Sequence, residues 1–267
     1  MRLLIPLVPN PDAPLPRANP LAKIAAALAL MIALFASLDW VTALLILAGL
    51  LALLPWSGLH PTTLLRRAWP LLLAAASIGF LNVVFAAQQL GPTIVVIGPL
   101  RIGEETLVNG AGLAARLVAI LTAGLLSTAT SQPTDLADAL VQQLRVSPRF
   151  AIGALAALRL LPIMAVEWQT LAMARRARGV DAGRNPFAGL RLFAGMVLAL
   201  LVGAVRRGGR MALAMEARGF GALPCRTTAR HQRMRPGDWA WIVGAVLLAA
   251  VAVGASVALG TWRPLLG

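Results

Sequence analysis

The sequence predicts an all-α integral membrane protein with about five transmembrane helices and long amphipathic helices on the cytoplasmic side. Of its 267 residues, 59% are hydrophobic and only 13% are charged, and the mean hydropathy is +0.79. Soluble domains are usually about 45–50% apolar and about 25% charged. Several apolar runs of about 15–20 residues follow one another, each about long enough to cross a bilayer as a helix. The basic residues gather in a few segments between these runs, as Lys and Arg do on the cytoplasmic side of a membrane.

Four spans are expected from the apolar runs 21–38, 41–56, 69–87 and 107–130. Asp39 separates the first two runs and is expected at the water interface, because an acid at mid-span costs about 3 kcal/mol on insertion scales. Arg116 lies inside the fourth run, where it is expected to snorkel or to pair within the bundle. Residues 88–106 contain Gly-Pro pairs and a β-branched run, typical of a loop with a short hairpin. A last span is expected within residues 238–260, with tryptophans at both interfaces.

The orientation follows from the distribution of basic residues. Residues 1–20 form an arm whose prolines interrupt its apolar start, so we expect an irregular cytoplasmic segment and not a signal peptide. The arm and the connection after the second run carry basic residues. The loops on the other side carry Arg101 alone, offset by Asp39, Glu104 and Glu105. The N-terminus is therefore expected in the cytoplasm and the protein in the cell membrane, as a multi-pass protein.

The region between Thr170 and Asp238 holds 13 of the 24 basic residues. Two further apolar stretches, 150–166 and 187–205, lie in or beside it. If both crossed the bilayer, the arginines from Arg175 to Arg184 would lie outside, against the positive-inside rule. If neither crosses, every basic cluster lies inside, and the two stretches belong to long helices at the inner face. We prefer this layout, and seven simple spans remain the alternative.

A shorter helix is expected before them. Residues 131–134 read Ser-Gln-Pro-Thr, which is a helix-start signal, and Asp135 and Asp138 suit the positive end of the helix dipole. The chain thus divides into four parts: the arm, 1–20; a four-helix transmembrane region, 21–130; a cytoplasmic region with the long helices, 131–237; and the final transmembrane helix with the C-terminus, 238–267.

One motif occurs twice in the cytoplasmic region, as Ala177-Arg178-Gly179 and as Ala217-Arg218-Gly219. Each copy ends a long stretch compatible with a helix. Glycine is favoured just after a helix because it adopts positive φ freely, and an arginine in the last turn complements the negative end of the helix dipole. An arginine followed by a glycine is also common at helix ends that have no binding role. Arginine can bind a partner's carboxylate with two hydrogen bonds, and a helix end lying in a partner's groove is a known recognition mode.

Catalytic, metal and cofactor sites are not indicated. There is one cysteine, Cys225, and the two histidines, His60 and His231, are far apart in the sequence. The ten acidic residues are scattered, whereas an intramembrane enzyme needs clustered catalytic groups. The only lysine, Lys23, is not part of a phosphate-binding P-loop. A stand-alone secondary transporter would show inverted repeats with broken helices. The net charge of +14 is explained by membrane lipids and needs no nucleic acid.

Several motifs together resemble a known family, the transmembrane T component of energy-coupling factor transporters (the EcfT/CbiQ family). Residues 19–23, Asn-Pro-Leu-Ala-Lys, resemble the family's Asp-Pro-x-x-Lys motif at the start of the first span. Residues 131–136 resemble its segment after the fourth span, and residues 158–162 its Leu-Arg-Phe-x-Pro element. The two Ala-Arg-Gly copies match its two signatures. Asn19 replaces the usual aspartate, a small departure because both residues cap helices.

The resemblance implies a role in transport of vitamins, their precursors or transition-metal ions. It implies two cytoplasmic ABC ATPases as partners, as a homodimer or a heterodimer, and a small membrane S component that binds the substrate. The long helices would be coupling helices that rest on the ATPases, with Arg178 and Arg218 docked in ATPase grooves. The chain itself would be non-catalytic and without a cofactor. The substrate is chosen by the S component, so this sequence does not specify it.

Overall fold

The computed structural model describes residues 13–59, 61–86, 93–97, 100–180, 183, 185–221 and 230–262. The N-terminal part of the arm and much of the basic segment before the last span lie outside these ranges. The elements, in chain order, are α1 (Pro14–Arg17), α2 (Pro20–Ala36), α3 (Trp40–Ala52), the 3-10 helix η2 (Leu54–Ser57), α4 (Pro61–Val84), β1 (Thr93–Ile97), β2 (Leu100–Gly103), α5 (Glu104–Ala129), α6 (Pro133–Gln143), α7 (Pro148–Ala177), α8 (Pro186–Ala217) and α9 (Pro236–Ala258). They form two compact units, which we call the bundle unit (residues 2–144 and 232–267) and the hairpin unit (residues 145–231).

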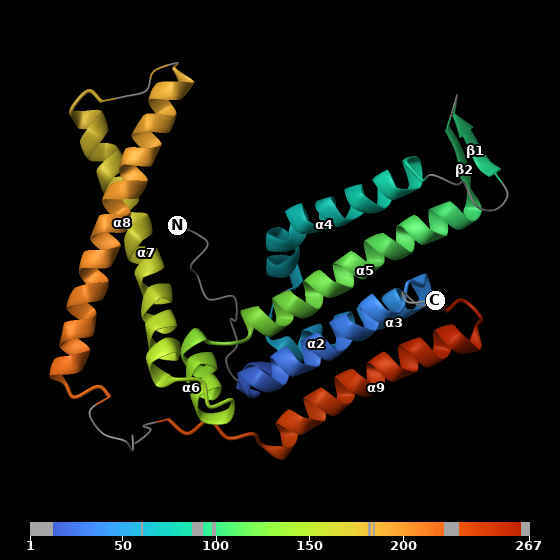
Figure 1. The fold of residues 1–267 in the computed structure, drawn as a ribbon. Helices are drawn as coiled ribbons and strands as arrows, with labels where there is room; N and C mark the ends of the chain where they lie inside the picture. The colour runs from blue at the N-terminus through green and yellow to red at the C-terminus, as the bar shows by residue number, and fades with distance from the viewer. Residues whose placement is uncertain are drawn as a thin grey trace. The chain divides into compact units, whose positions relative to one another are not determined.

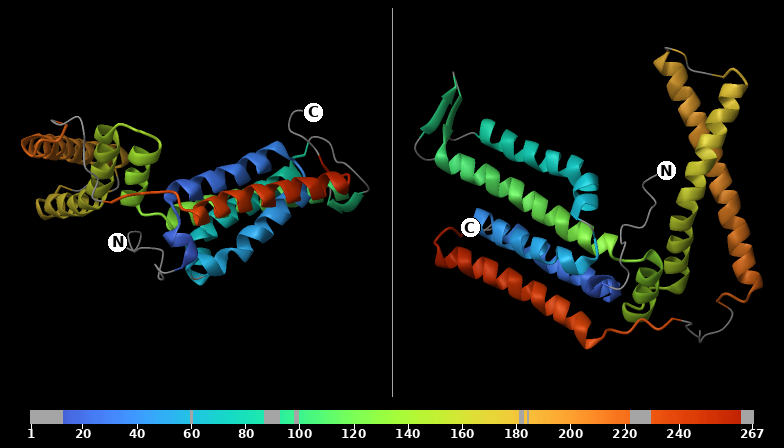
Figure 2. Two further views of the ribbon diagram at one scale, coloured as in Figure 1. Left: turned by 90° about the horizontal axis from the view of Figure 1, so that it is seen from below. Right: turned by 180° about the vertical axis from the view of Figure 1, so that it is seen from behind.

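The bundle unit is built around α5, which packs on α2, α3 and α4, while α9 packs on α2 and α3. Figures 1 and 2 show these helices side by side along their lengths. Although α2 and α3 follow one another closely, each packs far more on α5 and α9 than on the other. The buried apolar core consists of Leu30, Leu34, Ala43, Ile46, Leu50, Leu59, Ala119, Ala123, Leu126, Ala245 and Ala252.

Small residues set the distance between α4 and α5. A Cβ atom added at Gly79 would lie 2.8 Å from the carbonyl oxygen of Gly110, and one added at Gly110 would lie 2.9 Å from the carbonyl oxygen of Gly79. The two backbones therefore touch, as is common in membranes, where close packing replaces the hydrophobic effect between helices. In Figure 1, the first turns of α4 lie at an angle to the rest of the helix. This bend is explained by Pro70 inside α4, which removes a backbone hydrogen bond.

We expect Gly110→Ala to lower the thermal stability of the protein in detergent, because the new methyl group cannot fit against α4. Overpacking of this kind costs about 1–3 kcal/mol. Gly124→Ala is the matched control on the same helix, since its Cβ would meet only Met31 Cε at 3.5 Å. Both changes gain helix propensity, so the difference between the two melting temperatures measures the cost of the overlap between the new methyl group at residue 110 and α4. A Gly110→Ala protein as stable as the control would contradict this packing.

The five apolar runs predicted as spans each form a helix of the bundle unit: α2, α3, α4, α5 and α9. By length and composition, α5 and α9 are long enough to cross a membrane, and α2, α3 and residues 68–84 of α4 are shorter apolar helices. After the single turn residue Leu53, α3 is followed by η2, so helical structure covers almost all of the predicted run 41–56. The chain is a multi-pass, all-α membrane protein. The loop before α5 contains the short antiparallel pair β1 and β2, as the sequence predicts.

The helix predicted after the fourth span is α6, and it packs on α2. Its last residues also hold the chain that returns to α9. Gln232 N–H donates to Gln142 Oε1 at 2.8 Å, and Gln143 Nε2 donates to the Gln232 carbonyl at 3.1 Å. These two side chains therefore fix a segment about ninety residues further along the chain. Nothing in the sequence motifs indicated this contact.

The hairpin unit consists mainly of α7 and α8, which cross as an X (Figure 1). Several contacts between described residues join the helices. Arg207 Nη1 lies 2.8 Å from Glu167 Oε2 in an ion pair, and Arg175 Nη1 donates to the Leu192 carbonyl at 2.9 Å. The rings of Trp168 and Phe193 meet edge to face with centroids 5.4 Å apart. Polar and aromatic contacts made by the C-terminal half of α7 thus hold the two helices together.

Most of the apolar surface of this hairpin is uncovered. Of the described residues in the two helices, only Ala151 is buried. Large side chains such as Phe150, Phe187 (83% exposed) and Val205 are exposed. By length and composition alone, α7 and α8 could also cross a membrane. The layout in which neither crosses therefore stays a prediction.

Candidate functional site

The C-terminal end of α7 forms a Schellman motif. Gly179 has φ of +73° and its N–H donates to the Arg176 carbonyl at 2.9 Å. The N–H of Val180 donates to the Arg175 carbonyl at 3.0 Å. These two bonds close the helix in the way that a glycine in the left-handed region allows. Arg178 is the C-cap residue, so its side chain leaves the helix at its last turn.

The end of α8 repeats this geometry. Gly219 has φ of +76°, its N–H donates to the Glu216 carbonyl at 2.8 Å, and the Phe220 N–H donates to the Met215 carbonyl at 3.0 Å. Arg218 is again the C-cap residue. The helix-end role predicted for both glycines is confirmed. The Schellman motif by itself only ends a helix and implies no binding role, because α9 ends in the same way at Gly260 with Leu259 as its cap. The arginine distinguishes the two copies in the hairpin.

Both arginines are available to a partner. All six residues of the two Ala-Arg-Gly copies are exposed. Among the described residues, neither Arg178 nor Arg218 has a side-chain hydrogen bond or ion pair. Their backbone is fixed by the Schellman bonds, so the guanidinium groups project from a rigid base. Such an arginine can place two parallel hydrogen bonds on a carboxylate.

The two ends lie at opposite extremes of the hairpin. A Cβ at Gly221, just past α8, would be 3.2 Å from Arg149 Nη2 at the start of α7. The end of α8 therefore lies beside the beginning of α7, and the end of α7 lies a full helix away. α7 has 30 residues, and at 1.5 Å per residue such a helix is about 45 Å long. The hairpin thus presents two equivalent arginine ends on the order of 45 Å apart.

A polar cluster joins the residues 19–23 motif to two other helices of the bundle. Asn19 Oδ1 accepts from the Leu21 N–H at 2.9 Å, which confirms its capping role. The Asn19 N–H donates to Asp238 Oδ1 at 2.8 Å, and Lys23 Nζ donates to the carbonyls of Thr130 at 2.8 Å and Pro16 at 3.2 Å. The starts of α2 and α9 and the end of α5 are therefore locked together. From the sequence, only the cap of α2 by Asn19 could be expected, because Asp238 lies 219 residues further along the chain.

A second polar cluster lies at the opposite end of α2. Asp39 caps α3 by accepting from the Thr42 N–H at 2.7 Å, and it also accepts from the Ser37 hydroxyl. Arg116 donates to the Ser37 carbonyl, so of the two expectations for this residue, snorkelling or pairing within the bundle, the structure shows a partner within the bundle. Burial raises the pKa of Asp39, but hydrogen bonds from Ser37, Thr42 and Ser256 lower it, and the net pKa lies below its ordinary value. Asp39 is only 4% exposed, so other residues of the bundle unit cover it, and its position at the water interface stays a prediction.

Within the described part of the chain, no group of three or more His, Cys, Asp and Glu side chains could hold a metal ion. The groups that stand out are therefore the two exposed arginine ends and the two buried clusters that hold the helices together. This arrangement is suited to binding other proteins at fixed positions.

Comparison with known proteins gives a consistent result. Residues 12–228 match the family CbiQ, described as "Cobalt transport protein". The chain is 31% identical to the energy-coupling factor transporter transmembrane protein EcfT of Lacticaseibacillus paracasei, over 87% of this chain and 90% of that protein. The proteins of the same name from Heliobacterium modesticaldum and Thermosediminibacter oceani are 32% and 29% identical, over 86% and 87% of this chain and 88% and 90% of theirs. The chain therefore belongs to the EcfT/CbiQ family of transmembrane components of energy-coupling factor transporters.

Proposed function

We propose that this chain is the coupling subunit of an energy-coupling factor importer, in which the α7–α8 hairpin transmits the motion of two ATP-binding-cassette ATPases to a substrate-binding S component. The observation that carries the proposal is the pair of arginine ends. They have the same backbone geometry, both are exposed, and they lie on the order of 45 Å apart on one helical hairpin. Two equivalent ends fit two equivalent or similar partners.

The docking chemistry assigns a role to each residue of the motif. Arg178 and Arg218 each bind an acidic group in a groove of one ATPase. Gly179 and Gly219 turn the chain away so that the helix end can enter the groove. Ala177 and Ala217 keep the helix end narrow enough to enter the groove, since they carry only a methyl group. ATP is bound and hydrolysed by the ATPases, because this sequence has no P-loop.

The S component binds against the uncovered apolar surface of the hairpin unit. Exposed apolar patches of such size mark protein or membrane contacts. Phe187, Leu190 and Phe193 at the start of α8 belong to this surface. The matching family is described as "Cobalt transport protein", which favours a transition-metal ion as the substrate. A vitamin or a vitamin precursor is the other class that the resemblance implies.

In this proposal the hairpin and the N-terminus lie on the cytoplasmic side. We expect a single cysteine placed at the exposed residue Val180, in a Cys225→Ser background, to react with a membrane-impermeant maleimide only after the cells are permeabilised. Labelling in intact cells would show that α7 crosses the membrane and would support seven simple spans. A cysteine at Glu104, predicted to be external, is the control that should react in intact cells.

Co-purification tests the function itself. We expect the tagged protein, extracted in detergent from its own cells, to bring down ABC ATPases and at least one small, very apolar membrane protein. ATPases without a second membrane protein would leave the docking role intact and contradict the S-component contact. A well-folded chain that brings down neither would contradict the coupling role.

A further inference from the structure

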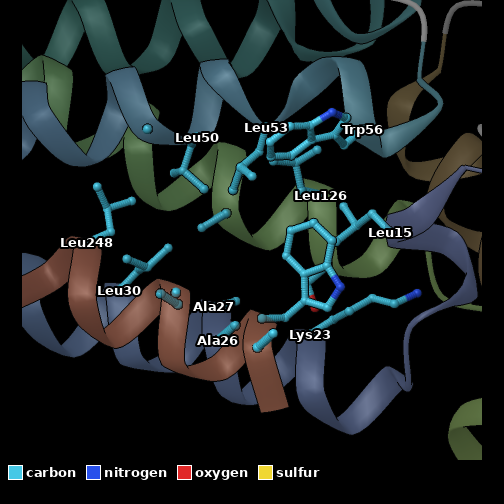
Figure 3. Close-up of a pocket in the computed structure, with 17 residues that line it drawn as sticks. Leu15, Lys23, Ala26, Ala27, Leu30, Leu50, Leu53, Trp56, Leu126 and Leu248 are labelled. Carbon is cyan, nitrogen blue, oxygen red and sulfur yellow. The ribbon is translucent and has the colours of Figure 1, made fainter. Parts of the chain in front are cut away.

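Two charged residues near the ends of α7 and α8, Arg176 and Glu216, take no part in the docking described for Arg178 and Arg218. Both are exposed, and among the described residues neither side chain forms a hydrogen bond or an ion pair. Lys23 is different: it lines an apolar cavity of about 370 Å³ in the bundle unit (Figure 3) and donates to two carbonyls there, so its charge is used within the protein. The charges of Arg176 and Glu216 are available to another molecule.

Arg176 and Glu216 occupy the same place in the two copies of the helix end. Each lies two residues before the arginine of its Ala-Arg-Gly motif. The Gly179 N–H donates to the Arg176 carbonyl at 2.9 Å, and the Gly219 N–H donates to the Glu216 carbonyl at 2.8 Å. The same backbone hydrogen bond therefore fixes both residues, and side chains of opposite charge leave the motif from the same position.

The neighbouring residues increase this difference in charge. The residue before Arg176 is Arg175, whereas the residue before Glu216 is Met215. The last turn of α7 is thus basic, and the last turn of α8 has no basic residue. With the arginine of each motif included, the end of α7 carries three positive charges, and the end of α8 carries one positive and one negative charge. The two ends share their backbone geometry but not their electrostatics.

The stability of the helices explains Arg176 but not Glu216. The C-terminal end of a helix is the negative end of its dipole, so a cation is favourable there and an anion is unfavourable. Arg149 lines the same groove as Glu216, but the two side chains form no ion pair. The unfavourable position of Glu216 is therefore not offset by a direct partner within the described part of the hairpin unit. A positive group on a bound protein would offset it.

We propose that Arg176 and Glu216 select different ATPases for the two ends of the hairpin, an inference that rests on the proposed coupling function. The ATPase at the end of α7 presents a second carboxylate beside the one that binds Arg178. The ATPase at the end of α8 presents a Lys or Arg side chain at the corresponding place. One groove cannot satisfy both ends, because like charges brought together in an interface cost affinity and exclude the wrong partner. The two ATPases are therefore different chains, each bound at one end.

The test uses the complex purified in detergent with its own ATPases, with the photoreactive residue benzoyl-phenylalanine in place of Met173 or of Leu213. These two residues are exposed and lie at corresponding positions, five residues before the arginine of each motif. We expect the two positions to crosslink to two different ATPase chains, which mass spectrometry identifies. Crosslinks from both positions to the same chain or chains would overturn the proposal and leave the coupling function intact.

Charge reversal tests the two residues themselves. Arg176→Glu should lower the yield of the crosslink from position 173 about tenfold and spare the one from position 213, because it places like charges together at one end only. Glu216→Arg should have the converse effect. The variants should fold, since both side chains are exposed and unbonded. The double variant exchanges the two charges, so each position should crosslink to the other chain more often than in the wild type.

The controls carry the same changes of charge elsewhere. Arg206→Glu matches Arg176→Glu in the exposed interior of α8, and Glu104→Arg matches Glu216→Arg in the exposed first turn of α5. Both should keep both crosslinks. Equal yields in the charge-reversal variants and their controls would overturn the roles of Arg176 and Glu216. A wild-type protein that retains no ATPase contradicts the coupling function itself, whereas one that retains a single ATPase species contradicts only the selection.

Discussion

Replacing Arg178 and Arg218 together by alanine is expected to leave a folded, membrane-inserted protein that no longer retains its ATPases. The fold should survive because the Schellman bonds use only backbone groups, and Gly179 and Gly219 remain. Each lost bidentate contact to a carboxylate costs about 2–3 kcal/mol. That is about 30- to 150-fold in affinity for each end, and two losses should dissolve a complex of modest affinity. The measurement is co-purification of the ATPases, with substrate uptake in cells as a second readout.

The control for charge is Arg206→Ala with Arg210→Ala. Both arginines are exposed in the interior of α8, and their loss changes the net charge by the same amount. This protein should keep its ATPases and its transport activity. If the two double variants behave alike, general electrostatic attraction and not docking at the helix ends holds the complex. Retention of ATPases by the Arg178 and Arg218 variant would refute the assignment of these two residues.

Replacing Asp39 by alanine is expected to destabilise the bundle unit strongly, and by more than Gly110→Ala does. The side chain caps α3, binds Ser37, and offsets the charge of Arg116. Removing one partner from a buried group of charges leaves the other uncompensated, which costs about 3–5 kcal/mol. We expect the melting temperature in detergent to fall by about 10 °C or more. Glu104→Ala removes an acid from the exposed first turn of α5 and should change the melting temperature little.

The Asp39→Asn variant separates the contribution of the helix cap to stability from the contribution of the negative charge. Asparagine can still accept from the Thr42 N–H, so this variant should retain part of the stability that alanine loses. The pH dependence gives an independent check. Because the folded pKa of Asp39 lies below its ordinary value, its ionised form contributes stability above the unfolded pKa, and this contribution is lost as the pH falls through the folded pKa. In the wild type, the melting temperature should therefore fall as the pH falls through the folded pKa of Asp39, and the Asp39→Asn protein should lack this part of the fall. Identical acid profiles would contradict a role for the charge.

The sequence by itself was sufficient for the existence of the bundle helices and for the glycine ends of α7 and α8, whereas α4 begins at Pro61, within the segment that the sequence predicts as a basic connection. Apolar runs without charges can be satisfied only as helices in lipid, so α2, α3, α4, α5 and α9 were predictable from composition and length. Glycine is the residue that takes positive φ without strain, so the ends of α7 and α8 were predictable as well. The arginines before them could be identified as docking candidates for the same local reason. These are properties of short segments, and a short segment carries them wherever it lies.

Only the tertiary structure decided which distant residues meet. No local pattern pairs Asn19 with Asp238, Lys23 with the Thr130 carbonyl, or Arg116 with the Ser37 carbonyl, because hydrogen bonds between helices depend on rotation and register that the period of one helix does not set. The close approach of Gly79 to Gly110 and the cavity beside Lys23 arise in the same way. In each case the partner is chosen by packing over the whole bundle, where many side chains must fit at once.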